Sequence, residues 1–358
     1  MNSDFDLSAV NPKGETLLHV AAQKGKPKII NALITRGAKI EAVSTSASHI
    51  WFRTRNKKAR LNSSNQGGRT ALHVAALNNN PENVKCLLDA GACVNSLTTE
   101  KNTPLHYAVA VENFEIVEMI VKKGADVNAL SYYSSPLQVA CGSICYVKLK
   151  QQQYFEFNSI YYKKFFHKQG IASSYIYNSR IVTFLLNHGA NIEEISRVCG
   201  TALEEYCYNG NLEIAKILLS SGANPNRSGN ALLYNAVLNQ DLDIIRLISK
   251  HVDVNQRRPY GIPLHWVAST PCITSEDIVD ILMEHGANIH AKDDRREESA
   301  LRLAVLNQNK AAILRRLLKF NANIDAYINW KGQFSIPSIV HILISLPMIL
   351  RGTNLKMQ

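Results

Sequence analysis

Four histidines stand at matched positions of a short motif that recurs along the chain. The copies read Thr16-Leu-Leu-His19, Thr70-Ala-Leu-His73, Thr103-Pro-Leu-His106 and Ile262-Pro-Leu-His265. Histidine is a common metal ligand and general base, so the set invites a metal or catalytic interpretation. In other copies the same slot holds Gln138, Glu204, Tyr234 and Arg302. One variable residue per copy predicts side chains spread along a row, with a structural role, rather than a converging site.

Other catalytic and cofactor signals are missing from the sequence. It contains no Gly-rich phosphate loop, no His-Glu-x-x-His and no Gly-x-Ser-x-Gly. Its acids are scattered, and the closest pair, Glu204-Glu205, would not face each other on a helix. We therefore predict no enzyme activity, no cofactor, no metal site and no small-molecule substrate.

The cysteines favour free thiols over a metal or disulfide framework. Their number is odd, no Cys-x-x-Cys occurs, and most sit in apolar helical patterns. We predict buried free thiols and a reducing, cytoplasmic compartment. They are Cys86, Cys93, Cys141, Cys145, Cys199, Cys207 and Cys272.

The motif belongs to a repeat of about 33 residues. A Gly-Ala pair begins 21 residues after Thr16, Thr70, Thr103 and Thr201, and less regular copies bring the number of units to eight, from about Asn11 to Tyr327. In the second unit Leu72, Ala75 and Ala76 predict one short helix, and Val84, Leu87 and Leu88 predict a second. No unit can bury its apolar face alone, so the pattern predicts stacking into an all-α solenoid.

The Thr-Pro-Leu-His and Gly-Ala-Asp/Asn-Val-Asn signatures resemble those of the ankyrin repeat family. The resemblance implies stacked helix-turn-helix units with β-turn fingers on one side, and a protein-binding function without catalysis. It also implies that the threonine hydroxyl starts each first helix and bonds to the histidine ring. A cap of this kind contributes about 1 kcal/mol.

We therefore expect three parts in the chain. Residues 1–10 form an N-terminal lead-in, residues 11–327 the solenoid, and residues 328–358 an apolar tail. Two insertions, at about 44–64 and 142–178, interrupt the solenoid. The opening Met-Asn-Ser-Asp-Phe-Asp-Leu has no basic or apolar segment of the kind found in signal peptides.

In ankyrin proteins, partners usually meet the finger tips and the exposed part of the first helix. A row of arginines at these positions favours a protein partner with an acidic surface. We expect a monomer without a membrane anchor. The candidate partner-binding residues are Lys13, Arg69, Glu100, Tyr132, Arg197, Tyr208, Arg227, Arg258, Arg295 and Arg296.

The first insertion carries a basic cluster. Residues 51–68 hold five cations and no acid, which is a large share of the formal net charge of +11. Lys57, Lys58 and Arg60 fit a minimal nuclear-import pattern. The alternatives are a solvated loop and a contact with nucleic acid or an acidic surface.

The second insertion interleaves aromatic residues with lysines. Residues 145–170 carry five lysines and one glutamate among many tyrosines and phenylalanines. Packing against the solenoid, partner binding and stacking of single-stranded nucleic acid are all compatible with this composition. No RNA-binding motif accompanies it, so nucleic acid is the least favoured.

The tail segment from Phe334 to Leu350 has no acid, lysine or arginine. It is shorter than the roughly 20 apolar residues of a spanning helix, and a capping helix is the leading interpretation. A membrane tail and a ubiquitin-ligase adaptor box around Leu346-Pro347 are the alternatives.

We therefore expect a non-catalytic protein-binding scaffold. The irregular repeats and large insertions are similar to ankyrin proteins of intracellular bacteria and large DNA viruses. A host protein would then be the partner, and an effector would be delivered to host cytoplasm or nucleus. The alternatives are a substrate adaptor for a ubiquitin ligase and a nuclear or nucleic-acid-associated binder.

Overall fold

The computed structural model places the helices in two compact units, Met1–Ser228 (unit 1) and Gly229–Gln358 (unit 2). The described part also contains two isolated antiparallel β-bridges, between Val10 and Thr16 and between Lys292 and Ser299. The structure describes residues 6–44, 67–141, 179–195, 200–204, 212–227, 231–257, 261–273, 275–293, 297–307 and 311–322.

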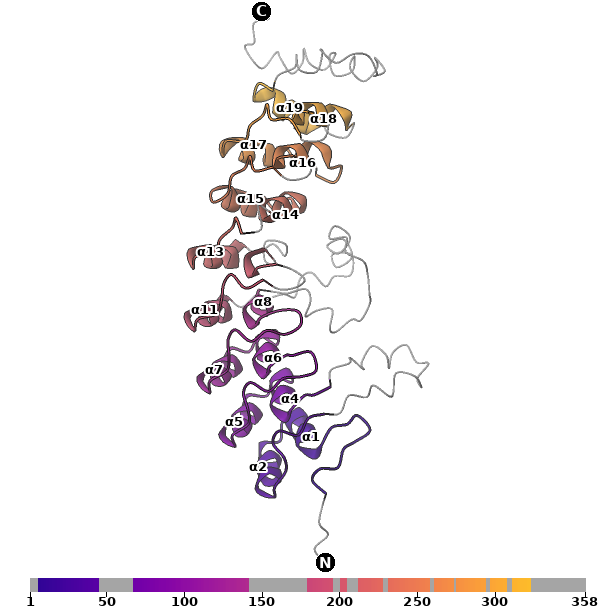
Figure 1. The fold of residues 1–358 in the computed structure, drawn as a ribbon, viewed down its shortest axis with the longest axis vertical. Helices are drawn as coiled ribbons and strands as arrows, with labels where there is room; N and C mark the ends of the chain where they lie inside the picture. The colour runs from indigo at the N-terminus through magenta and orange to yellow at the C-terminus, as the bar shows by residue number, and fades with distance from the viewer. Residues whose placement is uncertain are drawn as a thin grey trace, which may run out of the picture. The chain divides into compact units, whose positions relative to one another are not determined.

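Unit 1 consists of helix pairs in which each helix packs against its own partner and against the equivalent helix of the next pair. Figure 1 shows first and second helices as two adjacent columns. The first helices are α1 (Leu17–Lys24), α4 (Ala71–Leu77), α6 (Pro104–Ala110) and α8 (Pro136–Ala140). The second helices are α2 (Pro27–Thr35), α5 (Pro81–Asp89), α7 (Phe114–Lys122), α11 (Ser179–Asn187) and α13 (Leu212–Ser220).

The residue types explain how the first and second helices of a pair pack differently. In α4, Ala75 and Ala76 are fully buried, and their small side chains let the neighbouring first helices approach closely. In α5, Val84 and Leu87 are buried at helical spacing, and Pro81 occupies the first turn, where its missing N–H costs nothing. The two helices predicted for the second repeat are confirmed.

One pair in unit 1 is formed by segments far apart in the sequence. The helices α8 and α11 pack against each other although residues 141–178 separate them. An aromatic cluster ties α11 to α7, with Phe114 and Phe184 edge to face at 5.2 Å between ring centroids. The Arg180 guanidinium carbon lies 3.6 Å from the Phe114 centroid. Stacking therefore continues across the interruption.

In the part of unit 1 that the structure describes, α2, α5 and α7 are each followed by a loop that leads into a finger. In the third finger, the Thr98 N–H donates to the Asn102 carbonyl at 3.0 Å, which closes the hairpin. Neighbouring fingers are joined by backbone hydrogen bonds, from Thr99 N–H to the Gly67 carbonyl at 3.0 Å and from Tyr132 N–H to the Glu100 carbonyl at 3.1 Å. The fingers of these repeats therefore line up side by side.

The first insertion leaves and re-enters the fold at the finger between α2 and α4. Ser44 N–H donates to the Arg69 carbonyl at 2.8 Å, and Gly68 N–H donates to the Ser44 carbonyl at 2.9 Å. Gly68 has a φ of +79°, and a Cβ added there would lie 3.1 Å from the Thr99 nitrogen. Glycine is thus needed where this finger meets the next.

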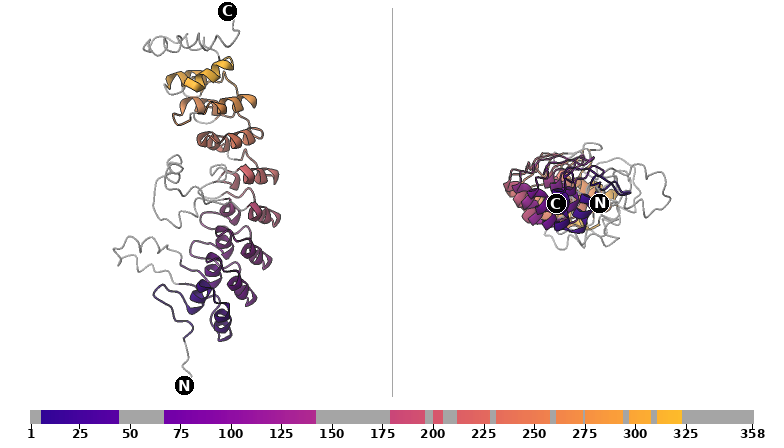
Figure 2. Two further views of the ribbon diagram at one scale, coloured as in Figure 1. Left: turned by 180° about the vertical axis from the view of Figure 1, so that it is seen from behind. Right: turned by 90° about the horizontal axis from the view of Figure 1, so that it is seen from below.

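Unit 2 repeats the same arrangement, seen from two further directions in Figure 2. Its last two second helices are linked by Arg316, which reaches Glu276 at 3.5 Å and Asp280 at 3.3 Å. The first helices are α14 (Ala231–Asn239), α16 (Pro263–Ser269) and α18 (Ala300–Leu306), and the second helices are α15 (Leu242–Ser249), α17 (Asp277–Glu284) and α19 (Ala311–Lys319).

The prediction of buried thiols is wrong for two cysteines. Cys141 is buried and Cys86 is half-buried, but Cys93 and Cys272 are exposed. Both exposed residues lie in connections between helices, where solvent covers one side. The tail after residue 322 and the body of both insertions lie outside the described residues, so the predicted domain limits and capping helix stay predictions.

The contact between fingers at Gly68 leads to a testable expectation. Gly68→Ala forces a side chain into left-handed backbone and against Thr99, whereas Gly124→Ala meets only the backbone strain, because no atom lies within 4 Å of its Cβ position. We expect losses in the free energy of unfolding of about 2 and about 1 kcal/mol respectively. Urea denaturation followed by circular dichroism checks this, and equal losses would contradict the role assigned to the finger contact.

Candidate functional site

The recurrent histidine joins two successive repeats. In the second repeat, the Thr70 N–H donates to His73 Nδ1 at 3.1 Å, and the Thr70 hydroxyl oxygen lies 2.9 Å from the same nitrogen. The other ring nitrogen, Nε2, lies 3.1 Å from the Asn102 carbonyl oxygen. Because Nδ1 accepts the backbone N–H, the proton is on Nε2, which donates to the carbonyl just before the next threonine.

The same geometry recurs with other residues in the slot. His19 reaches the Arg69 carbonyl at 2.7 Å, and His106 reaches the Ser134 carbonyl at 3.1 Å. Gln138 accepts the Ser135 N–H at 2.8 Å and donates to the Gly200 carbonyl at 2.9 Å. The sequence-based prediction that the threonine caps the helix and bonds to the histidine is therefore confirmed, and the second bond to the next repeat adds to it.

In unit 2, His265 keeps the hydrogen bond to the next repeat but lacks the bond to a threonine hydroxyl. The Ile262 N–H donates to His265 Nδ1 at 3.1 Å, but isoleucine has no side-chain oxygen to complete the cap. His265 Nε2 still lies 2.9 Å from the Ala291 carbonyl oxygen. Tyr234 donates its hydroxyl to the Gly261 carbonyl. Histidine, glutamine and tyrosine in the slot thus all reach a carbonyl of the next repeat.

The environment of these histidines suits architecture rather than proton transfer. His73 and His106 are completely buried. Burial lowers the pKa of His73 to about 3 and that of His106 to about 4, so both rings are neutral at pH 7. Both ring nitrogens are already engaged, which leaves no free lone pair for a metal. Among the residues that the structure describes, no three His, Cys, Asp or Glu side chains gather in a possible metal site.

A second ladder of polar side chains holds the loops in register. Asn95 donates to the Gly124 carbonyl at 3.2 Å and accepts the Asp126 N–H at 2.8 Å. Asn128 does the same one repeat later, with the Gly189 carbonyl at 2.9 Å and the Asn191 N–H at 2.6 Å. This loop ladder explains why asparagine recurs four residues after the loop glycine.

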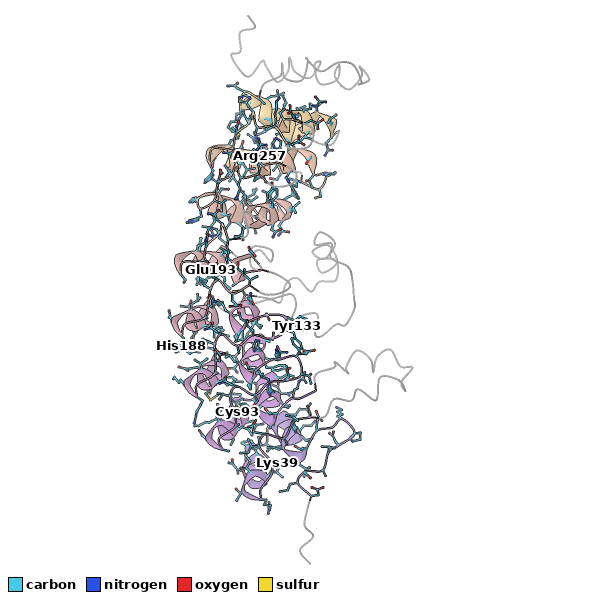
Figure 3. The ribbon with its side chains drawn as sticks, in the orientation of Figure 1. Lys39, Cys93, Tyr133, His188, Glu193 and Arg257 are labelled. Carbon is cyan, nitrogen blue, oxygen red and sulfur yellow. The ribbon has the colours of Figure 1, made fainter. Side chains whose placement is uncertain are left out.

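Glutamate replaces asparagine in two of these loops. Glu41 accepts the Cys93 N–H at 2.8 Å, and Glu193 accepts the Asn224 N–H at 2.6 Å. A carboxylate can keep the acceptor half of the bond but cannot donate to a carbonyl. Figure 3 labels Lys39, Cys93 and Glu193 on three of the loops that this ladder connects.

Four candidate partner-binding residues of unit 1 lie on the fingers. Lys13 is exposed on the first finger, and Arg69 is half-buried at the base of the second. Glu100 lies at the tip of the third finger, and burial raises the pKa of its carboxyl group. Tyr132 lies on the fourth finger with 44% of its surface exposed. The structure brings Arg69, Glu100 and Tyr132 onto successive, hydrogen-bonded fingers.

Two cations on these fingers lie over tyrosine rings. The Arg69 guanidinium carbon is 5.3 Å from the Tyr107 centroid, and Lys101 Nζ is 5.5 Å from the Tyr132 centroid. Cation–π contacts at this distance hold flexible side chains in place. Sequence reasoning missed Lys101, whose neighbour Glu100 it selected. Tyr133, labelled in Figure 3, adds a further exposed ring on the finger side.

Of the remaining candidate partner-binding residues, the structure describes Arg227 alone. Arg227 follows α13, and its guanidinium lies 3.4 Å from the Glu193 carboxylate, so its charge is partly engaged within unit 1. The nuclear-import residues and the other candidates fall outside the described residues, and their roles stay predictions. They are Lys57, Lys58, Arg60, Arg197, Tyr208, Arg258, Arg295 and Arg296.

Sequence reasoning also missed a row of exposed apolar side chains. They stand six residues after the glycines that follow α2, α5, α7 and α11, so an alignment on the Gly-Ala pairs was sufficient to find them. The row consists of Val43, Leu97, Leu130 and Ile195.

Comparisons with known proteins agree with the geometry of the capped helix pairs and fingers. A family model described as ankyrin repeats (three copies) matches residues 49–131, 170–258 and 233–329, and a single ankyrin repeat matches residues 13–45. The chain belongs to the ankyrin repeat family. Ankyrin repeats generally mediate protein–protein interactions and typically form binding scaffolds without catalysis.

Several curated proteins share segments with this ankyrin chain. Two ankyrin repeat proteins of Rickettsia felis are 33% and 31% identical over 114 and 120 residues, which cover 29% and 31% of this chain and 50% and 38% of those proteins. The E3 ubiquitin-protein ligase XBAT32 of Arabidopsis thaliana is 36% identical over 99 residues, which cover 24% of this chain and 18% of the ligase. The chain thus spans half or less of each relative.

Among solved structures, the human ASB11 ankyrin repeat domain is 21% identical, with a TM-score of 0.43, and the match covers 84% of this chain and 98% of that chain. In the described part of the protein, no helix is long and apolar enough to cross a bilayer.

The buried histidines predict a specific pH dependence. A histidine has a pKa of about 6.5 when unfolded, and folding lowers the pKa of His106 to about 4. Its contribution to stability is therefore complete above about pH 6.5 and is lost as the pH falls from there toward 4. His106→Gln keeps both hydrogen bonds, as Gln138 shows, but removes the titration.

Between pH 7.5 and pH 5 we expect the wild-type protein to lose roughly 2 kcal/mol more unfolding free energy than His106→Gln. Urea denaturation at the two pH values measures the difference. The same pH dependence in both proteins would contradict a buried, neutral His106.

Proposed function

We propose that the chain is a non-catalytic scaffold that binds a protein partner through the finger surface of unit 1. We define this finger surface by Lys13, Arg69, Glu100, Lys101, Tyr132 and Tyr133. The observation that carries the proposal is that Arg69 and Lys101, on adjacent fingers joined by a backbone hydrogen bond, each lie over a tyrosine ring. Arg69 lies over the buried Tyr107 of α6, and Lys101 lies over the exposed Tyr132 of the next finger. Tyrosine and arginine are the residue types that contribute most to protein–protein interfaces.

The stiffness of this surface supports binding. Arg69 also donates its Nε–H to the Tyr107 hydroxyl at 3.4 Å, and its backbone is fixed by Ser44 and His19. A side chain that is already ordered loses little conformational entropy when a partner docks. Glu100 lies close enough for the positive charge of Arg69 to oppose the pKa increase caused by burial.

An acidic partner fits the charges of these fingers and the basic insertion anchored among them. Ser44 and Gly67 hold the ends of a segment in which residues 51–68 carry five cations and no acid. We extend the proposal to Arg197, Tyr208, Arg227, Arg258, Arg295 and Arg296 as further contacts. We further propose a host protein as the partner, reached in host cytoplasm or nucleus.

Two other functions give different results in the same experiments. A ubiquitin-ligase adaptor would recruit ligase subunits through residues 336–358, and the name of XBAT32 is what favours it. A nuclear or nucleic-acid-associated binder would lose nuclear accumulation on Lys57→Ala/Lys58→Ala. It would also bind nucleic acid with a steep dependence on salt.

The finger surface can be tested with matched triple variants. Lys13→Glu/Lys101→Glu/Tyr132→Ala alters three exposed finger side chains. The control, Lys85→Glu/Lys216→Glu/His188→Ala, makes the same two charge reversals and removes an aromatic ring, a histidine in place of a tyrosine, at exposed sites on or next to second helices. Each protein serves as bait in eukaryotic cytosol with mass-spectrometric readout, followed by a Kd measurement on the recovered partner.

We expect the finger variant to raise the Kd at least tenfold, because it removes interface residues that are already ordered. The control should leave the Kd unchanged. A partner lost equally from both variants, or from neither, would contradict the proposal. Ligase subunits that persist with the finger variant but vanish when residues 336–358 are deleted would establish the adaptor instead.

A further inference from the structure

Four exposed apolar side chains of unit 1 occupy one and the same loop position. Each lies six residues after the loop glycine, namely Gly37, Gly91, Gly124 and Gly189. Val43, Leu97, Leu130 and Ile195 are 52%, 54%, 49% and 54% exposed. Single exposed apolar residues are ordinary on a protein surface, but repetition at one structural position in successive repeats makes a row.

The loop ladder fixes the register of this row. Glu41, Asn95 and Asn128 each bond to the next loop, at the Cys93, Asp126 and Asn191 N–H groups. Each row residue follows its ladder position by two residues, directly after a turn such as the one closed by the Ala129 N–H and the Asp126 carbonyl at 3.3 Å. The row is therefore carried by loops that are hydrogen-bonded to one another.

The apolar character is confined to four loops of unit 1, because the position six residues after Gly222 holds Ser228. The equivalent positions in unit 2, six residues after His251 and Gly286, hold the exposed cations Arg257 and Lys292. The position therefore has no structural need for an apolar residue. Its occupation by valine, leucine and isoleucine in unit 1 must serve something other than stacking, since half of each side chain is left in water.

The charges beside the row are mainly negative. Between the glycine and the row residue, the four loops carry one cation, Lys39, and four acids. Glu193 is paired with Arg227 at 3.4 Å, which still leaves acids in excess. Basic groups on an occupant would complement this surface. The four acids are Glu41, Asp126, Glu193 and Glu194.

The spacing of the row selects the conformation of an occupant. Packed helices lie about 8–10 Å apart. Because the row residues occupy the same position in successive stacked repeats, we infer a similar spacing for the row. In a polyproline II segment every third side chain points the same way, about 9 Å along the axis. In a β-strand, residues on the same face recur at about 7 Å, which is shorter than the row spacing. In an α-helix, side chains match the row spacing only at every seventh residue, and the apolar stripe of a helix is wider than one side chain.

We propose that the row of Val43, Leu97, Leu130 and Ile195 docks an extended, polyproline II-like segment of a partner protein, with an apolar residue at every third position and basic residues between. This docking track lies before the finger tips, since Leu97 directly precedes Thr98 of the hairpin. It is distinct from the finger surface and does not depend on an acidic partner there.

A labelled peptide of four Pro-Leu-Arg repeats is the probe, titrated with the full-length protein and followed by fluorescence anisotropy. Leu97→Ser/Leu130→Ser removes half of the row. Leu17→Ser/Ile29→Ser is the matched control, because these exposed apolar residues lie on α1 and α2, outside the row. Circular dichroism confirms that each variant is folded.

We expect the peptide to bind, and the row variant to weaken binding about tenfold while the control changes it less than twofold. Pro-Ser-Arg and Pro-Leu-Glu repeats should bind at least tenfold more weakly. Absence of Pro-Leu-Arg binding, equal binding of Pro-Ser-Arg repeats, or insensitivity to Leu97→Ser/Leu130→Ser would overturn the proposal.

Two further comparisons separate this track from its alternatives. Tighter binding of a helical peptide with leucine at every seventh residue would show that the row receives a helix, and would overturn the extended occupant. The finger variant Lys13→Glu/Lys101→Glu/Tyr132→Ala should bind Pro-Leu-Arg repeats normally. If that variant abolishes peptide binding, the peptide occupies the fingers and the row is not its site.

Discussion

Stacking in unit 1 depends on one polar bridge from a repeat to the next. In the repeats of His19, His73, His106 and Gln138, the slot side chain accepts the N–H of its own cap residue and donates to the carbonyl just before the following cap. His73 and Gln138 show that two different residues make it with similar distances. Because the bridge is buried, removing it would leave a carbonyl without water, at a cost of about 1–3 kcal/mol. The helix pairs are short, so apolar contact alone would leave their register loosely defined.

The bridge also explains how the protein tolerates large interruptions. The partner carbonyl of His19 belongs to Arg69, on the far side of the first insertion, and that of Gln138 belongs to Gly200, beyond the second. Both bonds connect repeats that an insertion separates in the sequence. The loop ladder does the same from Asn128 to Asn191. Insertions can therefore grow from a finger or between two helices while the stack retains its order.

Much of the fold could be predicted from the sequence because the same motifs recur in successive repeats. The Thr-x-Leu-His motif and the Gly-Ala pair marked the caps and helix ends of the regular repeats, and the drift from His to Gln138 argued against a metal site. What could not be read was where the exposed side chains point. Lys101 was missed because a finger tip depends on hairpin closure by Thr98 and Asn102. The apolar row was missed because an exposed leucine has no signature until its neighbours in space are known.

The two proposed surfaces use this stiffness in different ways. Arg69 and Lys101 on the fingers lie over the rings of Tyr107 in α6 and Tyr132 on the next finger, and the loops hold single apolar side chains, one per repeat. Neither surface requires movement of the scaffold, since the backbone of each is fixed by hydrogen bonds to the next repeat. Unit 2 keeps the slot bridge through His265 but carries Arg257 and Lys292 in place of the apolar row. The same architecture thus presents different chemistry in its two units.

The most direct test of the account is nitrogen-detected NMR of the histidine rings in the full-length protein. The bridge requires that His73 and His106 carry their proton on Nε2 and remain neutral well below pH 6. We expect chemical shifts of the Nε2–H tautomer that do not change between pH 7.5 and pH 5. A proton on Nδ1, or titration of either ring near pH 6.5, would contradict the bridge and return these histidines to the list of groups able to do chemistry.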